Sequence, residues 1–339
     1  MKTPLDHVLR HNTWATGTLL DFCRALDPAR LDDQARGTYG SLYGTLQHLV
    51  GGEQWYVQLI TGELIGAAIR RDQRHTLDEL ASIASAIGAR ELVIAASDDP
   101  DRSFSVDGDD DRSTVGTVLA QLVHHGNEHR TQATTILAAT ASSHRPSARG
   151  PTAALSGSPS TTGTDVTQPM LRQLRHDVWA TEQLIARCRQ LTAEQLQLSV
   201  PGTYGTVLRT LQHIVSSDEG YLVRLLGTLL HDPLFRHEPD VALDVIASHV
   251  PHVTDAVERL FASGDVDGDR LIRDTPARRP DQPRFEMNAW APLTQFVHHG
   301  NDHRAQICTT LSAHGIEPPD LQVWPYAMEL GASREAKEA

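Results

Sequence analysis

Apolar side chains recur with a helical period in both halves of this chain. Between residues 5 and 26 they follow a spacing of about 3.6, which is typical of one face of an amphipathic helix. The same spacing predicts seven further helices, at residues 41–61, 76–96, 114–139, 169–188, 206–227, 241–262 and 291–313. Short stretches at 102–106 and 284–288 are predicted to be extended strands before the last helix of each half. Four helices in each half predict an all-α fold of two tandem four-helix bundles.

The chain also repeats its own motifs in a fixed order. Three of them recur with an offset of 165 residues: HNTWAT and HDVWAT begin at positions 11 and 176, GTYG at 37 and 202, and LQH at 46 and 211. VHHGNEHR and VHHGNDHR begin at positions 123 and 297, an offset of 174. The shared order, with nine more residues between LQH and HHGN in the second half, indicates that a whole domain is duplicated. GTYG is interpreted as a helix breaker.

Composition places the boundaries between the two halves. Residues 141–166 are rich in Ser, Thr, Gly, Pro and Ala and contain few bulky apolar side chains, so they are predicted to be a flexible linker. The bundles are then expected at 1–140 and 167–316. The tail at 317–339 begins with a proline-punctuated, partly apolar stretch, and it is predicted to pack across a bundle.

Histidines within the repeats are the strongest candidates for chemistry. On a helix, residues four apart share a face, so His125 and His129 point the same way, and so do His299 and His303. His48 and its counterpart His213 follow Leu-Gln inside apolar helices, where an unpaired polar group is costly. Each half therefore offers three imidazoles for one divalent ion, with open coordination positions that are typical of catalytic sites.

One alternative to this hypothesis remains at this point. The histidines could instead make ordinary hydrogen bonds inside the bundles. A zincin-type metalloprotease is disfavoured, because Gly126 and Gly300 stand where that motif has its glutamate base. Imidazole ligands suit Zn, Ni, Fe or Cu, so the sequence does not choose the metal.

Other repeated polar residues lie near the predicted trios. The candidates for positions around the metal are His124 and His298, Glu53 and Asp218, and Gln132 and Gln306. The histidine pair is predicted to pack against or support the ligands, with a role as competing ligands left open. The acidic pair either accepts hydrogen bonds from ligand imidazoles or lies on a solvated helix face. The glutamine pair is predicted to line the pocket.

Two further pairs carry weaker signals. Arg130 and Arg304 follow the last histidine of each motif and could bind an anionic substrate or lie at the surface. Cys23 and Cys188 are equivalent by the offset of 165, and both occupy the apolar stripe of a helix. They are interpreted as buried small hydrophobic residues rather than nucleophiles.

Composition excludes several classes of protein. The formal net charge of −13 leaves no basic stripe for a nucleic acid backbone. No apolar run approaches the length of a membrane span, and the N-terminal residues lack the apolar core of a signal peptide. Three cysteines without CxxC spacing support neither a disulfide framework nor a cysteine-type zinc site. A cytoplasmic protein with no nucleic acid or membrane partner is therefore predicted.

The motifs resemble those of the DinB/YfiT-like family of metal-binding four-helix bundles. The resemblance rests on His48 with HGNEHRTQ from position 125, and on His213 with HGNDHRAQ from position 299. It covers residues 3–140 and 168–316 and implies one divalent ion in each bundle. The implied ligands are His48, His125 and His129, and then His213, His299 and His303. Family members commonly pair through their helices, which implies an internal pseudo-dimer of the two halves.

The resemblance also implies a class of chemistry. Characterised relatives include transferases and isomerases that use glutathione, bacillithiol or mycothiol. We therefore expect a metal-dependent S-transferase that joins a low-molecular-weight thiol to an electrophilic small molecule. Two lysines among 30 basic residues are typical of GC-rich genomes, which favours mycothiol. The alternatives are a non-enzymatic, stress-related metal-binding protein and a metal-dependent hydrolase.

Overall fold

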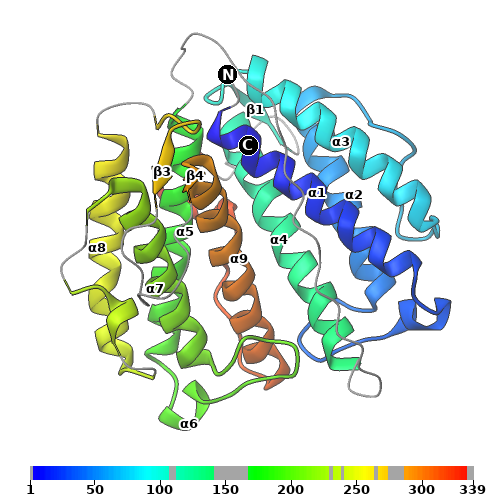
Figure 1. The fold of residues 1–339 in the computed structure, drawn as a ribbon. Coiled ribbons are helices and arrows are strands. Elements are labelled where there is room, and N and C mark those ends of the chain that lie inside the picture. The colour runs from blue at the N-terminus through cyan, green and yellow to red at the C-terminus, as the bar shows by residue number, and fades with distance from the viewer. Residues whose placement is uncertain are drawn as a thin grey trace, which may run out of the picture.

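The predicted all-α fold of two tandem four-helix bundles is confirmed by the computed structural model (Figure 1). The structure describes residues 3–106, 112–140, 167–228, 232–237, 240–262, 266–273 and 286–333. The predicted linker at 141–166 lies outside the described residues. The helices of the first bundle are α1 (Pro4–Arg24), α2 (Leu42–Thr61), α3 (Leu77–Ser97) and α4 (Val115–Thr140). Those of the second are α5 (Thr167–Cys188), α7 (Val207–Leu226), α8 (Leu243–Phe261) and α9 (Trp290–Ala313).

Shorter elements connect these helices. They are η1 (Pro28–Asp32), α6 (Ala193–Leu196), η3 (Leu234–Arg236) and α10 (Val323–Glu329). A small antiparallel hairpin precedes the last helix of each bundle, formed by β1 (Ser103–Ser105) with β2 (Arg112–Thr114) and by β3 (Leu271–Arg273) with β4 (Glu286–Asn288). The predicted strands correspond to β1 and β4. Their partners were not predicted, because each strand has only three residues and too few positions to show a period.

Capping residues explain where the helices begin. Thr3 and Asp6 form a capping box at the start of α1, and Thr76 and Glu79 form another at the start of α3. Ser41 caps α2 through a hydrogen bond from the Gly44 amide, and Thr206 caps α7 in the same way. The hydroxyl that follows each GTYG motif therefore starts the helix, and the motif itself forms the loop before it.

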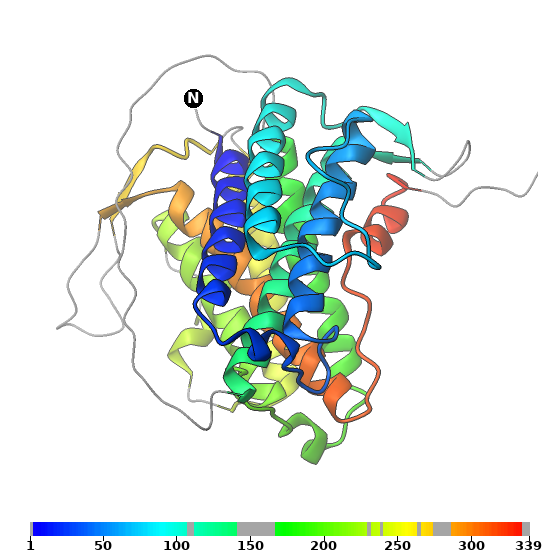
Figure 2. The ribbon, with the colours of Figure 1, turned by 90° about the vertical axis from the view of Figure 1, so that its right-hand side faces the viewer.

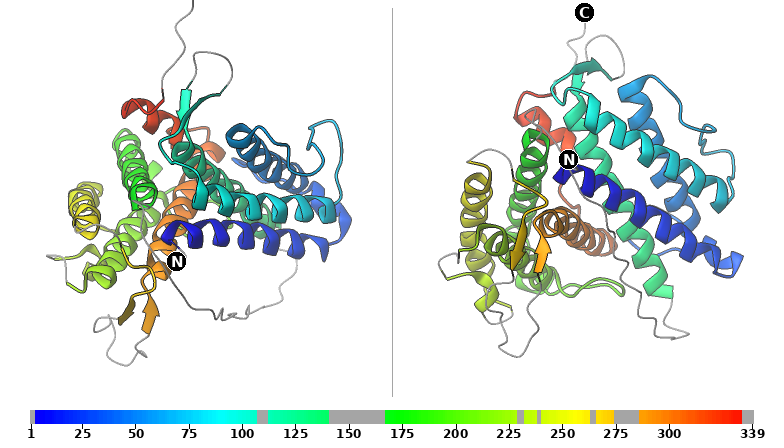
Figure 3. Two further views of the ribbon diagram at one scale, coloured as in Figure 1. Left: turned by 90° about the horizontal axis from the view of Figure 1, so that it is seen from above. Right: turned by 45° about the horizontal axis from the view of Figure 1, so that its top comes forward.

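Equivalent helices pack in equivalent ways in the two bundles. Helix α1 packs on α3 and α2 on α4, while α5 packs on α8 and α7 on α9. The bundles lie side by side, with α4 next to α9 and α1 also against α9 (Figures 1 and 3). One hydrophobic cluster contains residues of both halves, so the two bundles share a continuous core. The halves therefore have the arrangement of an internal pseudo-dimer.

Two reciprocal hydrogen bonds cross the interface between the halves. Nδ1 of His124 lies 3.0 Å from Oδ1 of Asn301, and Nδ1 of His298 lies 2.7 Å from Oδ1 of Asn127. Both histidines are buried. Because 124 and 127 correspond to 298 and 301 in the repeat, the same contact is made twice with the partners exchanged.

Helix α3 is the one described helix that is long and apolar enough to cross a membrane. Its first turn nevertheless carries Asp78 and Glu79, and one of its faces packs against α1 and α2. A core helix of a bundle meets the same criteria, and 39% of the most apolar stretch of α3 is buried inside the protein.

The C-terminal segment packs across the helices, as its apolar residues predicted. Figure 2 shows it returning along the outside of the molecule to α10. Helix α10 contacts α4 of the first bundle and α5 of the second. Leu321 joins Trp179 and Ala180 in a small hydrophobic cluster separate from the main core.

Candidate metal centres

The three predicted histidines of the first bundle come together at one point. His48 lies on α2, and His125 and His129 lie one turn apart on α4. One ring nitrogen from each lies within 4.8 Å of the others. The Nε2 atoms of His48 and His125 are 3.4 Å apart. His125 and His129 are buried and His48 is partly buried, so the trio sits inside the bundle close to its surface.

The second bundle builds the same arrangement. His213 of α7 meets His299 and His303 of α9, again with one nitrogen from each within 4.8 Å of the others. The Nε2 atoms of His213 and His299 are 3.0 Å apart. Among the described residues, each of these two groups contains three histidines and no fourth ligand candidate.

Gln132 and Gln306 set the protonation of one histidine in each trio. The Gln306 Oε1 accepts from the Tyr204 backbone N–H at 2.9 Å and lies 3.1 Å from Nδ1 of His303. Because that oxygen is an acceptor, Nδ1 of His303 must carry the proton and Nε2 keeps its lone pair. Gln132 makes the matching contact with His129 at 2.9 Å. The glutamines therefore direct an imidazole lone pair toward the centre of each trio.

Burial favours the neutral form of five of these imidazoles, those of His48, His125, His129, His299 and His303, because it lowers their pKa. It lowers the pKa of His129 and that of His299 to about 3 each, and it lowers the pKa of His125 well below its usual value. Where one of the two facing Nε2 atoms carries a proton, the rings can hydrogen-bond to each other, and where both are unprotonated they present lone pairs that a divalent cation can accept. The donor set, its neutrality and its directed lone pairs all fit a metal ion bound by three imidazoles.

The tyrosine of each GTYG motif covers its trio. Tyr39 stacks on His48 with 4.1 Å between ring centroids, and Tyr204 stacks on His213 at the same distance. Each tyrosine ring also meets the last histidine of its trio, His129 or His303, edge to face. Both tyrosines are nearly half exposed, so they form the outer wall of the sites. This role of the tyrosines was not predicted, although the repeated GTYG motif was a visible signal for it.

Each GTYG loop rests on the opposite bundle. Gly37 has φ +81°, and a Cβ there would overlap the Thr309 carbonyl oxygen of α9. Gly202 has φ +92°, and a Cβ there would come within 2.9 Å of the Ala138 side chain of α4. Glycine is required for both the positive φ and the close approach. The wall of each site is thus positioned by the other half of the chain.

Comparison with known families agrees with this architecture. The sequence model of the DinB family matches residues 1–140 and 164–334. The chain belongs to the DinB family. No curated protein matches the sequence. DinB proteins bind metals, and the duplicated match agrees with two tandem copies. The second match extends past residue 316 and takes in α10.

In this DinB protein, Glu53 and Asp218 lie inside the bundles near Arg130 and Arg304, although they were expected to orient ligands or to face solvent. Both are buried. The Glu53 carboxylate accepts from Asn12 at 2.9 Å, and burial raises its pKa to about 7. The pKa of Asp218 is raised well above its usual value, also by burial. Nδ1 of His125 and of His299 has no hydrogen-bond partner among the described residues, so neither carboxylate orients those rings.

Arg130 and Arg304 belong to the same buried network. They were expected to bind an anion or to lie at the surface, but their exposed fractions are 8 and 1%. Arg130 donates to Thr16 and Asn127, and Arg304 pairs with Asp177 and donates to Asn301. Their hydrogen bonds are used inside the protein, so neither arginine is a free anion site.

The three cysteines are poor nucleophiles in this structure. Cys23 and Cys188 are buried, as predicted, and burial raises the pKa of their thiols to about 11 and about 12. Burial also raises the pKa of the Cys308 thiol. A reaction of a thiol at the histidine trios would therefore need a thiol from outside the protein.

A third group of potential ligands lies between α7 and α8. Glu219 hydrogen-bonds His249 at 2.8 Å, and His252 lies nearby. Glu219 also accepts from the Leu234 amide in the loop that follows α7. Its counterpart Gln54 accepts from the Ile69 amide in the loop that follows α2. The two residues share a position and a loop-anchoring contact, so we assign Glu219 a structural role.

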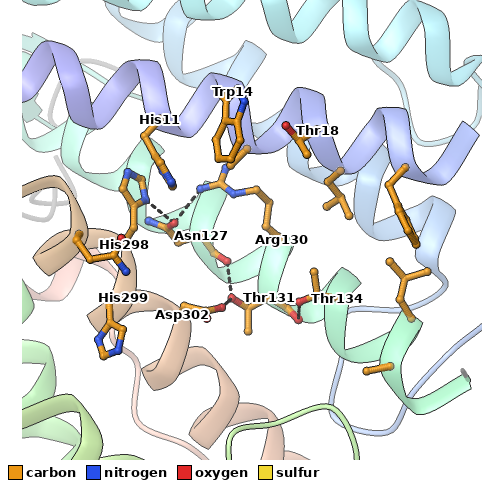
Figure 4. A pocket seen from close by; sticks show the side chains of 16 residues that line it. His11, Trp14, Thr18, Asn127, Arg130, Thr131, Thr134, His298, His299 and Asp302 are labelled. Atoms are coloured by element: carbon orange, nitrogen blue, oxygen red, sulfur yellow. Dashed lines mark hydrogen bonds between the residues drawn. The ribbon is translucent and has the colours of Figure 1, made fainter. Parts of the chain in front are cut away.

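A cavity of about 700 Å³ opens between α1, α4 and α9 (Figure 4). His298 and the trio member His299 line it, together with the exposed Trp14. Arg130 and Asp302 also line it, but both are hydrogen-bonded to neighbouring side chains. The lining thus offers apolar surface beside one of the two histidine trios.

Proposed function

We propose that this chain is a cytoplasmic, divalent-metal-dependent enzyme that transfers a low-molecular-weight thiol of the mycothiol type to an electrophilic small molecule. In this proposal one Zn, Ni or Fe ion is held by His48, His125 and His129, and another by His213, His299 and His303. The observation that carries it is the pair of histidine trios, with Nε2 atoms 3.4 and 3.0 Å apart and a glutamine oxygen facing Nδ1 of the last histidine in each.

Three protein donors suit catalysis better than a purely structural role. Structural sites are usually closed by four protein ligands, whereas catalytic sites keep a position for substrate. Among the described residues, each of the two trios brings together three histidines. This difference favours an enzyme over the alternative of a non-enzymatic metal-binding protein.

The raised pKa values of the three cysteine thiols favour a thiol from outside the protein as the nucleophile. A bound divalent cation would supply the Lewis acid that lowers the pKa of that thiol, so that the thiolate forms near neutral pH. Burial lowers the pKa of His299 to about 3, a tyrosine stacks against each trio, and apolar surface lies beside His299. In the transfer the thiol loses its proton, its sulfur forms a bond to the electrophilic carbon, and the leaving group departs with its electron pair.

The test is consumption of thiol by zinc- or nickel-loaded protein with 1-chloro-2,4-dinitrobenzene. Mycothiol, glutathione and cysteine would be offered in parallel, and a p-nitrophenyl ester without thiol would report hydrolysis. The matched control is the His48→Ala/His213→Ala variant, with its helix content checked by circular dichroism. We expect consumption with one thiol well above that control. Consumption equal to the control with every thiol would overturn the transferase proposal.

A further inference from the structure

The pseudo-symmetry of the chain creates two equivalent grooves, and only one of them is filled among the described residues. The filled groove lies between α4, α5 and α9 and holds the C-terminal segment from Glu317 to α10. The open groove lies between α1, α4 and α9 and is the cavity of about 700 Å³. Since α5 corresponds to α1, and α9 and α4 correspond to each other, the two grooves occupy matching places.

Contacts along the filled groove define what it holds. Arg187 donates to the Glu317 carbonyl at 2.8 Å, and the Leu321 carbonyl lies 3.0 Å from Nε2 of His176. The Leu321 side chain packs with Trp179, Ala180 and Cys308. Gln121 accepts from the Val323 amide at 2.8 Å. The segment thus offers a carbonyl to a histidine, an amide to a glutamine and apolar bulk to a tryptophan.

Aromatic side chains complete this occupation. Tyr326 packs on Trp179 with 5.4 Å between ring centroids. Trp324 approaches Tyr56, which itself meets the trio member His125 edge to face. The Trp179 indole N–H also donates to the Glu329 carboxylate at 2.9 Å. The filled groove therefore combines aromatic and apolar contacts with a few hydrogen bonds, and it ends beside the first trio.

The open groove presents the counterparts of these same residues, and no segment that the structure describes lies across them as the C-terminal segment does in the filled groove. The counterparts of His176, Trp179, Ala180, Arg187, Cys308 and Gln121 all line the cavity, and they are His11, Trp14, Ala15, Phe22, Thr134 and Gln295. Trp14 is 63% exposed, whereas its counterpart Trp179 is 8% exposed. Figure 4 shows His11 and Trp14 descending from α1 toward Asn127 and Arg130 of α4, with His299 on the facing helix.

The difference between the grooves extends to the two trios. Gln295 is exposed and His299 is partly exposed, while their counterparts Gln121 and His125 are buried. His299 lines the cavity directly. The open groove therefore leads to the second trio, and the C-terminal segment covers the matching approach to the first.

We propose that the open groove binds an aromatic small molecule bearing a carbonyl group, and that the C-terminal segment is a built-in occupant that keeps the first trio from receiving it. The charged groups of the groove are already paired, so a neutral ligand fits it better than an ion. His11 stands where His176 meets a carbonyl, and Trp14 offers a free aromatic face. This ligand would be the electrophile of the proposed transferase, so the inference rests on that proposal in naming its substrate class.

The experiment is a fluorescence titration of the metal-free full chain with prodan, a neutral naphthyl ketone. We expect one prodan per chain. Trp14→Ala should weaken binding at least tenfold, and Trp55→Ala, which removes an exposed tryptophan outside the cavity, should leave it unchanged. Because Trp14 is largely exposed, its replacement should leave the fold intact. Thr18→Trp, which fills the cavity, is a second variant and should also abolish binding.

Release of the C-terminal segment tests the second part of the proposal. Trp324→Ala/Tyr326→Ala removes the aromatic contacts of that segment, and the stoichiometry should rise from one prodan to two. No binding, an affinity unaffected by Trp14→Ala and Thr18→Trp, or one prodan after release would overturn the proposal. The titration uses neither metal nor thiol. A negative titration would therefore not bear on the transferase proposal, and a negative transferase assay would not bear on ligand binding in the open groove.

Discussion

His124 of α4 donates a hydrogen bond to Asn301 of α9, with 3.0 Å between Nδ1 and Oδ1. The direction is fixed because the same oxygen accepts from Arg304 at 2.9 Å, and an arginine can only donate. His298 and Asn127 repeat the contact from the other side, with Arg130 as the second donor. Each of these residues lies within three positions of a trio histidine, so the interface between the halves and the two candidate metal sites are built from the same turns of helix.

We predict that His298→Ala destabilises the protein by about 1–3 kcal/mol, because it removes a buried hydrogen bond and leaves a void between the halves. Urea unfolding of the metal-free protein measures this change. His252→Ala, at an exposed position of α8, is the control and should change stability by less than about 0.5 kcal/mol. Equal effects of the two substitutions would show that the reciprocal bonds do not hold the halves together.

The buried His176 predicts a pH-dependent mutational effect. Burial lowers its pKa well below the ordinary value of about 6.5. As the pH falls below about 6.5, His176 becomes protonated in the unfolded chain but stays neutral in the folded chain. The unfolded state is stabilised by this protonation, so the wild-type protein loses stability. His176→Ala removes this pH-dependent loss. The decrease in the free energy of unfolding caused by the substitution should therefore be smaller at pH 5 than at pH 7.5, by up to about 2 kcal/mol.

Urea unfolding at the two pH values checks the His176 prediction. Comparing each variant with wild type at the same pH cancels the opposite contributions of buried acids such as Glu53, whose pKa is raised to about 7. His314→Ala, at an exposed position, serves as the control. A cost of His176→Ala that is the same at both pH values would contradict the account.

Gly37→Ala should lower the free energy of unfolding more than Gly62→Ala does, although both glycines have a positive φ. Gly62 has φ +74° and open space around it, so Gly62→Ala should cost about 1 kcal/mol from strain alone. At Gly37 the new methyl also meets the Thr309 carbonyl, which should add at least about 1 kcal/mol and displace the Tyr39 wall. Urea unfolding and zinc titration of both variants measure this. Matching costs, with unchanged zinc binding, would mean that the loop does not depend on the opposite bundle.

Gln306→Leu should weaken zinc binding at the second trio by about 10- to 100-fold, because His303 loses the acceptor that fixes its tautomer. Gln306→Glu keeps an acceptor at this position and should restore most of the affinity. Competition with a chromophoric chelator in a His48→Ala background isolates the second trio. If the Leu variant bound zinc as tightly as the Glu variant, the glutamine would have no role in orienting the ligand.

The fold followed closely from the sequence because its signals are local and repeated. Apolar periodicity located all eight long helices within a few residues, and the duplicated motifs identified two bundles. The histidine trios were predicted because i, i+4 spacing fixes two members on one helix face. The local sequence pattern did not predict burial correctly where a side chain contacts segments far away in the sequence. Arg130 looks like a surface residue after HGNEH, but Thr16 of another helix receives its hydrogen bond.

The repeated sequence motifs also could not predict how the two halves differ in exposure. Trp14 and Trp179 occupy equivalent positions in nearly identical motifs, yet their exposed fractions are 63 and 8%. The difference comes from a segment about 140 residues beyond Trp179, which covers only one of them. Tyr39 was missed for a related reason. Its loop reads as a helix breaker, and its stacking on His48 appears only once α2 is placed.

The most direct test of the two-site account is the zinc content of protein stripped with chelator, reloaded with excess zinc and separated from free metal, measured by mass spectrometry. The account predicts two ions per chain in wild type, one in His48→Ala or in His213→Ala, and none in the double variant. Two ions retained by the double variant, or none bound by wild type, would contradict it.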